Sequence, residues 1–298
     1  GKIAFHISGI GQEAAQVGAA FALERGTDFF FPYYRDWAFV LSVGMTLKEL
    51  MLDAFAKAED PTSGGRQMPG HYSCKRLGIA TGSSPVATQI PHAAGVAYAA
   101  KLQRRNFVTY VTLGEGSTNQ GDFHEGCNFA GVHKLPLIVL VENNQYAISV
   151  PVSKQLGGRV VDRAVGYGFV GVRVDGNDPL EVYRVVKDAR QRALRGEGPT
   201  LIEAMTYRLM PHSTSDDDLQ YRAKEEVDAH WEKDGLARYR NYLMECGLWS
   251  EEKEAELLER VMREINEATK YAEQAPYPAP EDALKHVYDE QGGLGQWR

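Results

Sequence analysis

Two short apolar runs near the middle of the chain predict a pair of buried strands. Residues 107–113 read FVTYVTL and residues 135–141 read LPLIVLV. Runs of this length that are rich in β-branched or aromatic residues are typical of strands covered on both faces. The segment between them is long enough for a crossover helix, so the pattern predicts a right-handed strand–helix–strand unit in a parallel sheet.

The same alternation of strands and helices continues toward the C-terminus. Residues 171–175 (GVRVD) and 200–204 (TLIEA) predict two further strands. Between them, residues 180–194 predict a helix, because its apolar side chains share one face at helical spacing. These are Val182, Val185, Val186 and Ala189. The whole pattern predicts an α/β fold, a parallel sheet flanked by helices.

The last part of the chain has a different pattern, with more charge and more helix-forming residues. Ser250 is a good N-cap, and Glu251 and Glu252 stabilise the first turn of the helix that would follow. Prolines in residues 275–280 (APYPAP) end that helix. Its apolar stripe comprises Leu257, Leu258, Val261, Met262, Ile265 and Ala268. We therefore predict an α/β domain over residues 1–220 and a helical extension over 221–298, packed on the domain or on a partner subunit.

Composition and charge narrow the class of protein. The chain has 298 residues, of which 43% are hydrophobic and 24% charged, as in ordinary globular proteins. Its net charge of −7, without a long basic block, argues against nucleic-acid binding. No apolar run approaches the roughly 20 residues of a membrane helix. Three cysteines without CxxC spacing suit a reducing compartment. We predict the cytoplasm, or the mitochondrial matrix in a eukaryote.

Polar residues follow both central strands where they end. Residues 114–121 read GEGSTNQG, and residues 143–146 read NNQY. The glycine-rich turn departs from the dinucleotide-binding fingerprint, because Asn119 takes the place of the third glycine. Glu142, however, lies where a ribose-binding acid would be expected. A nicotinamide-dependent Rossmann oxidoreductase, a generic phosphate loop and a purely structural turn therefore stay open as alternatives.

The chemistry of these side chains favours a metal site. Ligands bind at the carboxyl ends of strands in open parallel sheets, and both Glu115 and Asn144 follow such ends. Carboxylate, amide and carbonyl oxygens are hard ligands that suit Mg²⁺ or Ca²⁺. The backbone N–H groups of Gly116 and Ser117 precede a predicted helix, where phosphate binds readily. The stretch therefore predicts a metal–diphosphate site.

The same residues resemble a known family. Gly-Glu-Gly followed, after the next strand, by Asn-Asn resembles the thiamine-diphosphate-binding motif. FPYYRD, GRQMPGH, SSPVATQ, ENNQYAIS, VDGNDPLEVY and HSTSDDD resemble the α subunit of 2-oxo acid dehydrogenase E1 components. GRQMP with HSTSDD is most similar to the branched-chain type, and the resemblance covers essentially the whole chain. It implies oxidative decarboxylation of branched 2-oxo acids, with acyl transfer to a lipoylated E2 acyltransferase, in branched-chain amino acid catabolism.

The resemblance also implies roles for individual residues. Glu115 and Asn144 would bind Mg²⁺ through their side chains and Tyr146 through its carbonyl oxygen, in the α/β domain over 1–220. Thiamine diphosphate would contact Tyr33, Tyr34, Arg35, Ser84, Pro85, Val86, Gly114, Gly116, Ser117, Asn144, Ala147, Ile148, Arg208 and His212. A candidate K⁺ site comprises Ser83, Pro85, Thr88 and Gln89. The substrate pocket would comprise Phe5, Tyr34, Met68, His71 and Ser84.

His212 is the predicted catalytic residue, because an imidazole can donate to a 2-oxo acid and exchange protons near neutral pH. Without the resemblance, Arg35 would be interpreted as a surface charge, His212 as an exposed loop residue and Phe5 equally well as core. One position departs from the family pattern. Mitochondrial relatives carry an arginine at the position of Glu142, where it helps to neutralise the diphosphate, and Arg208 is our candidate replacement.

The resemblance implies that this chain is half of an active site. In the family the carboxylate that activates the pyrimidine ring of the cofactor comes from a β subunit, which implies an α2β2 heterotetramer. Pyruvate or acetoin dehydrogenase E1 α subunits have the same site with another substrate pocket. They are therefore the nearest alternatives to the branched-chain assignment.

Overall fold

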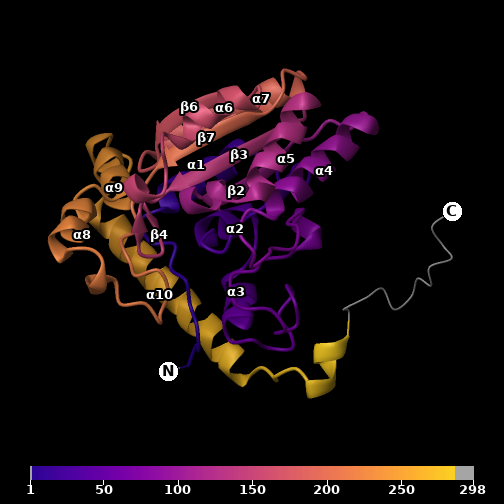
Figure 1. Cartoon of the computed structure of the whole chain (residues 1–298). Helices are drawn as coiled ribbons and strands as arrows, with labels where there is room; N and C mark the ends of the chain where they lie inside the picture. Colours follow the sequence, from indigo (N-terminus) through magenta and orange to yellow (C-terminus); the bar gives the residue numbers. More distant parts are fainter. Residues whose placement is uncertain (1, 286–298) are drawn as a thin grey trace.

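The predicted parallel sheet is present in the computed structural model, which describes residues 2–285 (Figure 1). Within that part of the chain, its strands are β1 (Phe29–Phe31), β2 (Thr109–Gly114), β3 (Leu137–Asn143), β6 (Val170–Asp175) and β7 (Thr200–Met205). Their order across the sheet is β1-β2-β3-β7-β6, and every neighbouring pair is parallel. A short antiparallel pair, β4 (Tyr146–Ala147) and β5 (Val150–Pro151), follows β3.

Helices cover both faces of the sheet. The α-helices within the described residues are α1 (Glu13–Ala22), α2 (Trp37–Val43), α3 (Leu47–Ala54), α4 (Gln89–Leu102), α5 (Gly121–Val132), α6 (Arg163–Gly166), α7 (Pro179–Leu194), α8 (Lys224–Trp231), α9 (Gly235–Glu245) and α10 (Glu251–Gln274), of which α3, α8, α9 and α10 lie away from the sheet. Short 3₁₀ helices are η1 (Lys75–Leu77), η2 (Glu115–Asn119), η3 (Val152–Lys154), η4 (Val160–Asp162), η5 (Asp218–Gln220) and η6 (Pro280–Leu284).

The core is divided between the two faces because successive strand side chains point to opposite sides. Tyr110 and Ile138 pack against α1, α2 and α7 on one face. Val111 and Val139 pack against α4, α5 and α6 on the other. Strands buried on both faces explain why the sequence shows continuous apolar runs instead of alternation. The predicted α/β fold is therefore confirmed.

The unit β2–α5–β3 confirms the predicted crossover. Its two strands are in parallel register, with Gly114 opposite Glu142, so the residues that follow them lie side by side. The turn between them differs from the prediction. The glycine-rich stretch first forms η2, and α5 begins only at Gly121. The Thr118 hydroxyl donates to the carbonyl of Glu115 at 2.6 Å, and the extended backbone of Gln120 separates the two helices.

Within the described residues, α8, α9 and α10 follow residue 220, where the charge pattern predicts helices. Ser250 caps α10 by accepting from the Lys253 N–H, and α10 ends before Ala275. The C-terminal half of α10 packs on α3 through Ala272 (Figure 1). Ala268 is also buried, whereas Leu258 and Met262 remain 55% and 54% exposed. Only part of the predicted stripe is therefore buried on this chain. Residues 286–298 of the predicted extension lie outside the described residues.

No helix within residues 2–285 is both long enough and apolar enough to span a membrane.

Candidate functional site

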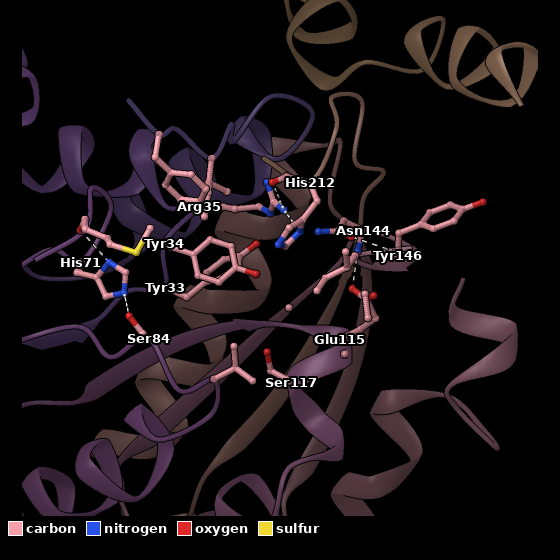
Figure 2. Close-up of a pocket in the computed structure, with 18 residues that line it drawn as sticks. Tyr33, Tyr34, Arg35, His71, Ser84, Glu115, Ser117, Asn144, Tyr146 and His212 are labelled. Carbon is pink, nitrogen blue, oxygen red and sulfur yellow. Dashed lines mark hydrogen bonds between the residues drawn. The ribbon is translucent and has the colours of Figure 1, made fainter. Parts of the chain in front are cut away.

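A cavity of about 380 Å³ lies where β2 and β3 end (Figure 2). All of the predicted metal and substrate residues line it, and so do the predicted cofactor residues except Pro85 and Arg208. One further lining residue, Ile7, was missed by the sequence analysis. Phe5 and Ile7 are two positions apart, and residues at this spacing on an extended segment share a face. That spacing was the only signal in the sequence for Ile7.

Glu115 and Asn144 meet at the wall of the cavity. One oxygen of the Glu115 carboxylate, Oε2, accepts from the Asn144 backbone N–H at 3.1 Å, and the other accepts from Gln155 Nε2 at 3.2 Å. Each oxygen keeps a lone pair for a further partner. Burial raises the pKa of Glu115, which is 1% exposed, so a nearby cation would stabilise its ionised form. A carboxylate, an amide and the Tyr146 carbonyl are a fitting donor set for Mg²⁺.

The neighbouring glycine, Gly116, allows Ala147 to pack closely against η2 at the edge of the cavity. A Cβ on Gly116 would lie 2.5 Å from the Cβ of Ala147, too close for any side chain. Gly116 and Ser117 belong to η2 and line the cavity beside Glu115. Close backbone approach at a glycine-rich turn beside a metal is what a diphosphate requires. The residues present therefore fit a metal-bound diphosphate.

Arg35 and His212 form a hydrogen-bonded pair above this site (Figure 2). Arg35 is 1% exposed, which excludes its interpretation as a surface charge. One guanidinium nitrogen donates to Ser8 O at 2.7 Å, and the other donates to His212 O at 3.1 Å and to His212 Nδ1 at 2.9 Å. Because a guanidinium can only donate, Nδ1 is an acceptor. The neutral ring of His212 therefore carries its proton on Nε2.

His212 is expected to stay neutral throughout the physiological pH range. Burial, followed by the charges of Arg35 and Arg208, lowers its pKa to about 4. Between about pH 6.5 and pH 4 the folded chain therefore binds fewer protons at His212 than the unfolded chain, and the stability contributed by His212 is lost as the pH falls.

Histidine NMR should show no protonation of the His212 ring at pH 6. Arg35→Gln should raise its pKa, and a wild-type ring titrating near pH 6.5 would contradict the assignment.

The substrate side of the cavity is built by the segment that carries Met68 and His71. His71 Nδ1 donates to the carbonyl of Met68 at 2.9 Å, so Nε2 of the singly protonated ring accepts from the Ser84 hydroxyl at 2.6 Å. Asp53, buried in α3, holds the segment by accepting from the Gly70 N–H at 2.9 Å. The Met68 side chain and the ring of Phe5 give this end an apolar wall. Such a wall suits a hydrocarbon side chain.

Arg208 does not line the cavity but lies behind it. Its guanidinium is 1% exposed and donates to Tyr221 Oη at 2.6 Å and to the Tyr146 carbonyl at 3.4 Å. Its Nε is buried without a hydrogen-bond partner among the described residues. Arg208 therefore brings positive charge close to the predicted metal loop without reaching the cavity surface.

The candidate K⁺ residues lie outside the cavity, near the start of α4. The Gln89 amide donates to the carbonyl of Thr112 at 3.0 Å, whereas its Oε1 is buried without a partner in the described part of the chain. Thr88 donates to Asp122 at 3.1 Å, and Ser83 borders a second hollow. The unpaired Gln89 oxygen is a hard donor of the kind that suits a monovalent cation.

Glu142, the departure from the mitochondrial pattern, is turned away from the cavity. Its carboxyl is fully buried and accepts from Gln16 Nε2 and from Tyr33 Oη, both at 3.1 Å. Burial and the neighbouring Asp36 raise the pKa of Glu142 well above its usual value, and burial raises that of Asp36 to about 6. The two carboxyls therefore share a proton at neutral pH. This reduces the negative charge beneath the predicted diphosphate site.

Comparison with known proteins places the chain among dehydrogenase E1 proteins. A family model described as dehydrogenase E1 component matches residues 1–281. The 2-oxoisovalerate dehydrogenase subunit alpha of Bacillus subtilis is 60% identical over 289 residues, 97% of this chain and 88% of that protein. The human mitochondrial 2-oxoisovalerate dehydrogenase subunit alpha is 43% identical over 97% of this chain, which spans only 65% of the human protein. The Bacillus subtilis pyruvate dehydrogenase E1 component subunit alpha is 42% identical, over 97% of this chain and 76% of that protein.

Proposed function

The chain belongs to the dehydrogenase E1 component family, and from this membership we propose that it is the α subunit of a branched-chain 2-oxo acid dehydrogenase E1. Its reaction is the oxidative decarboxylation of branched 2-oxo acids, with transfer of the acyl group to lipoylated E2. The observation that carries the proposal is one cavity that joins the Glu115–Asn144 oxygen site to an apolar wall. Family membership also argues against the nicotinamide-dependent Rossmann alternative.

Thiamine diphosphate supplies the electron sink for the decarboxylation when it is bound. Glu115, Asn144 and the Tyr146 carbonyl are proposed to hold Mg²⁺, and Gly116 and Ser117 to seat the diphosphate. The remaining contacts to the cofactor are proposed for Tyr33, Tyr34, Arg35, Ser84, Pro85, Val86, Gly114, Ala147, Ile148 and His212. Arg208 contributes its charge from behind the metal loop, where its guanidinium donates to the Tyr146 carbonyl.

The substrate would lie between His212 and the apolar wall. The Nε2–H of neutral His212 donates to an oxygen of the 2-oxo acid, while Arg35 keeps the ring in place through Nδ1. Phe5 and Met68 contact the branched side chain, and Ser84 keeps the His71 ring oriented. This arrangement recognises both ends of a branched 2-oxo acid, the polar end through a hydrogen bond and the hydrocarbon end through burial.

The proposal includes further partners. The orphaned Gln89 oxygen, with Ser83, Pro85 and Thr88 nearby, is proposed to bind K⁺. A β subunit completes the site in an α2β2 heterotetramer, which then meets lipoylated E2. The cytoplasm is the proposed location, because the relative that is 60% identical comes from a bacterium.

Substrate preference tests the proposal against the pyruvate dehydrogenase alternative. The α chain is assembled with its β partner, and kcat/KM is measured for 3-methyl-2-oxobutanoate and for pyruvate. We expect the branched acid to be favoured by at least about tenfold, because each additional methyl group buried in an apolar pocket contributes about 1–3 kcal/mol. Omission of thiamine diphosphate serves as the control. A preference for pyruvate would contradict the branched-chain assignment and support the alternative.

A further inference from the structure

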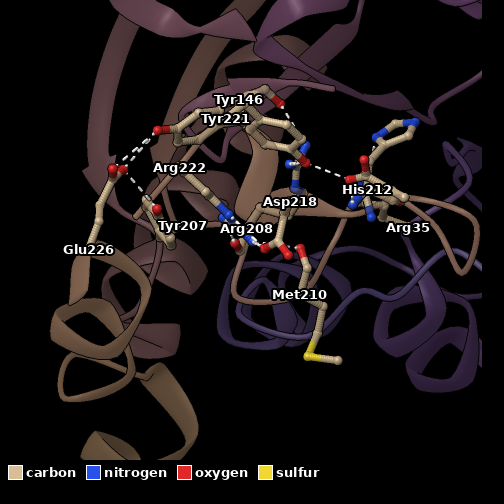
Figure 3. Close-up of polar contacts among 11 residues, drawn as sticks. Arg35, Tyr146, Tyr207, Arg208, Met210, His212, Asp218, Tyr221, Arg222 and Glu226 are labelled. Atoms are coloured by element: carbon tan, nitrogen blue, oxygen red, sulfur yellow. Dashed lines mark hydrogen bonds and ion pairs between the residues drawn. The ribbon is translucent and has the colours of Figure 1, made fainter. Parts of the chain in front are cut away.

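One carboxylate of the helical extension contacts the loop that carries the proposed metal ligands (Figure 3). Glu226, on α8, accepts from the hydroxyl of Tyr146 at 3.0 Å and from the hydroxyl of Tyr207 at 2.8 Å. The side chain of Tyr146 thus points toward α8, while its backbone lines the cavity. Tyr207 follows β7 and stacks on the ring of His230, also in α8, with 3.7 Å between centroids. Glu226 therefore joins the extension to the site.

Two buried arginines, Arg208 and Arg222, place their guanidinium groups over the ring of Tyr146. The guanidinium of Arg208 lies 5.6 Å from the ring centroid of Tyr146, and that of Arg222 lies 5.6 Å away as well. Arg222 donates to the carbonyls of Arg208 and Met210 and forms an ion pair with Asp218 (Figure 3). Cations over an aromatic face are attracted to it, more strongly when buried. The side chain of Tyr146 is thus fixed along its full length.

The backbone around Tyr146 needs such an anchor. Gln145 has φ +74° and Ile148 has φ +53°, both in the left-handed region that side chains other than glycine rarely adopt. Residues in this region are strained and persist only where the surroundings hold them. The same loop carries the Asn144 backbone N–H, which donates to Glu115 Oε2 at 3.1 Å.

From these contacts we infer that Glu226 is a positioning residue for the metal site. Through the hydroxyl of Tyr146 it holds the loop from Asn144 to Ile148 in the conformation that keeps Asn144 bonded to Glu115. This inference rests on the proposed Mg²⁺–diphosphate site and extends it. The helical extension becomes part of the machinery that binds the cofactor, although Glu226 itself touches neither metal nor cofactor.

The test measures Mg²⁺ affinity in the αβ assembly at saturating thiamine diphosphate, by calorimetric titration. Glu226→Ala should weaken Mg²⁺ binding by about 10- to 100-fold, the range found for residues that orient metal ligands without binding the metal themselves. Tyr146→Phe, which keeps the carbonyl and the ring, should give a similar loss. Glu226→Gln keeps an acceptor oxygen and should recover most of the affinity. Glu225→Ala, an exposed neighbour on α8, is the matched control and should change nothing.

The double variant Tyr146→Phe/Glu226→Ala decides whether the two residues act together. Its Mg²⁺ affinity should be no weaker than that of the weaker single variant, because coupled residues are not additive. Additive losses would overturn the route through Tyr146. The inference would be overturned if Glu226→Ala lowered the Tm but left the Mg²⁺ affinity equal to that of the Glu225→Ala control. If Glu226→Ala fails to fold, unchanged Mg²⁺ affinity in Tyr146→Phe would overturn it instead. Failure of the wild-type assembly to bind Mg²⁺ with thiamine diphosphate would instead contradict the proposed function.

Discussion

Glu115→Ala should abolish the Mg²⁺-dependent binding of thiamine diphosphate. Glu115 is the only carboxylate among the described residues that line the cavity, so its loss leaves only neutral protein ligands for the cation. Mg²⁺ bound partly by a diphosphate has few protein ligands. Its affinity therefore depends strongly on the one protein ligand that carries a charge. The affinity for Mg²⁺ should therefore fall by more than about 100-fold, beyond the effect of residues that orient metal ligands without binding the metal themselves. Calorimetry of the cofactor with and without Mg²⁺ measures the change.

Glu115→Gln separates the effect of the Glu115 charge from the effect of its packing, and Glu125→Ala is the control. Glu115→Gln keeps the size of the side chain and an oxygen for the Asn144 N–H, so it should preserve the fold while still weakening Mg²⁺ binding. Glu125→Ala changes an exposed carboxylate of α5 nearby and should leave both affinities unchanged. Unaltered cofactor affinity in Glu115→Ala and Glu115→Gln would refute the metal assignment.

The meeting of Glu115 with Asn144 was predictable because it depends on local patterns alone. Two apolar runs of strand length and one helical stretch between them define a parallel unit, and its register brings the residues after the strands together. The chemistry of a carboxylate and an amide at that place then favours a hard cation. The fold class followed from the same alternation of patterns, because strands covered on both faces are continuously apolar.

Other parts of the site had no local signal in the sequence. The left-handed backbone at Gln145 is unusual for its residue type, and side chains distant in the sequence contact the loop that contains it. Gln12 lies 132 positions before Asn144, and its Oε1 accepts from the Asn144 amide at 3.4 Å. Glu226 lies 80 positions after Tyr146. Contacts of this kind depend on the packing of complete helices, which periodicity in one sequence does not specify.

The predicted boundary at residue 220 separates two regions that are in direct contact. Helix formers and charge do increase there, and α8, α9 and α10 follow. Yet Tyr221 accepts from Arg208, and Glu226 accepts from Tyr146, so the first residues of the extension are bonded to the loop beside the cavity. A change of composition along a chain marks a change of local structure. It does not imply that the two regions act independently.

The isolated chain should bind the cofactor weakly and should not decarboxylate 2-oxo acids at an appreciable rate. Activation of thiamine diphosphate requires a carboxylate at its pyrimidine ring, and the single carboxylate that this chain presents in the described cavity is Glu115, already assigned to Mg²⁺. His71 has both ring nitrogens engaged, with Met68 and Ser84, and His212 is oriented by Arg35. We therefore propose that the β subunit supplies the activating group.

Release of carbon dioxide measures this dependence with the α chain alone, the β chain alone and the two combined, each with Mg²⁺ and thiamine diphosphate. The α chain should be slower than the combined chains by about 10²- to 10⁴-fold, the contribution typical of one general acid–base group. Addition of β should restore the rate for wild-type α but not for Glu115→Ala, because the proposed metal site lies on this chain and the proposed activating carboxylate on the other. An isolated α chain as fast as the pair would show that the cavity is complete without a partner.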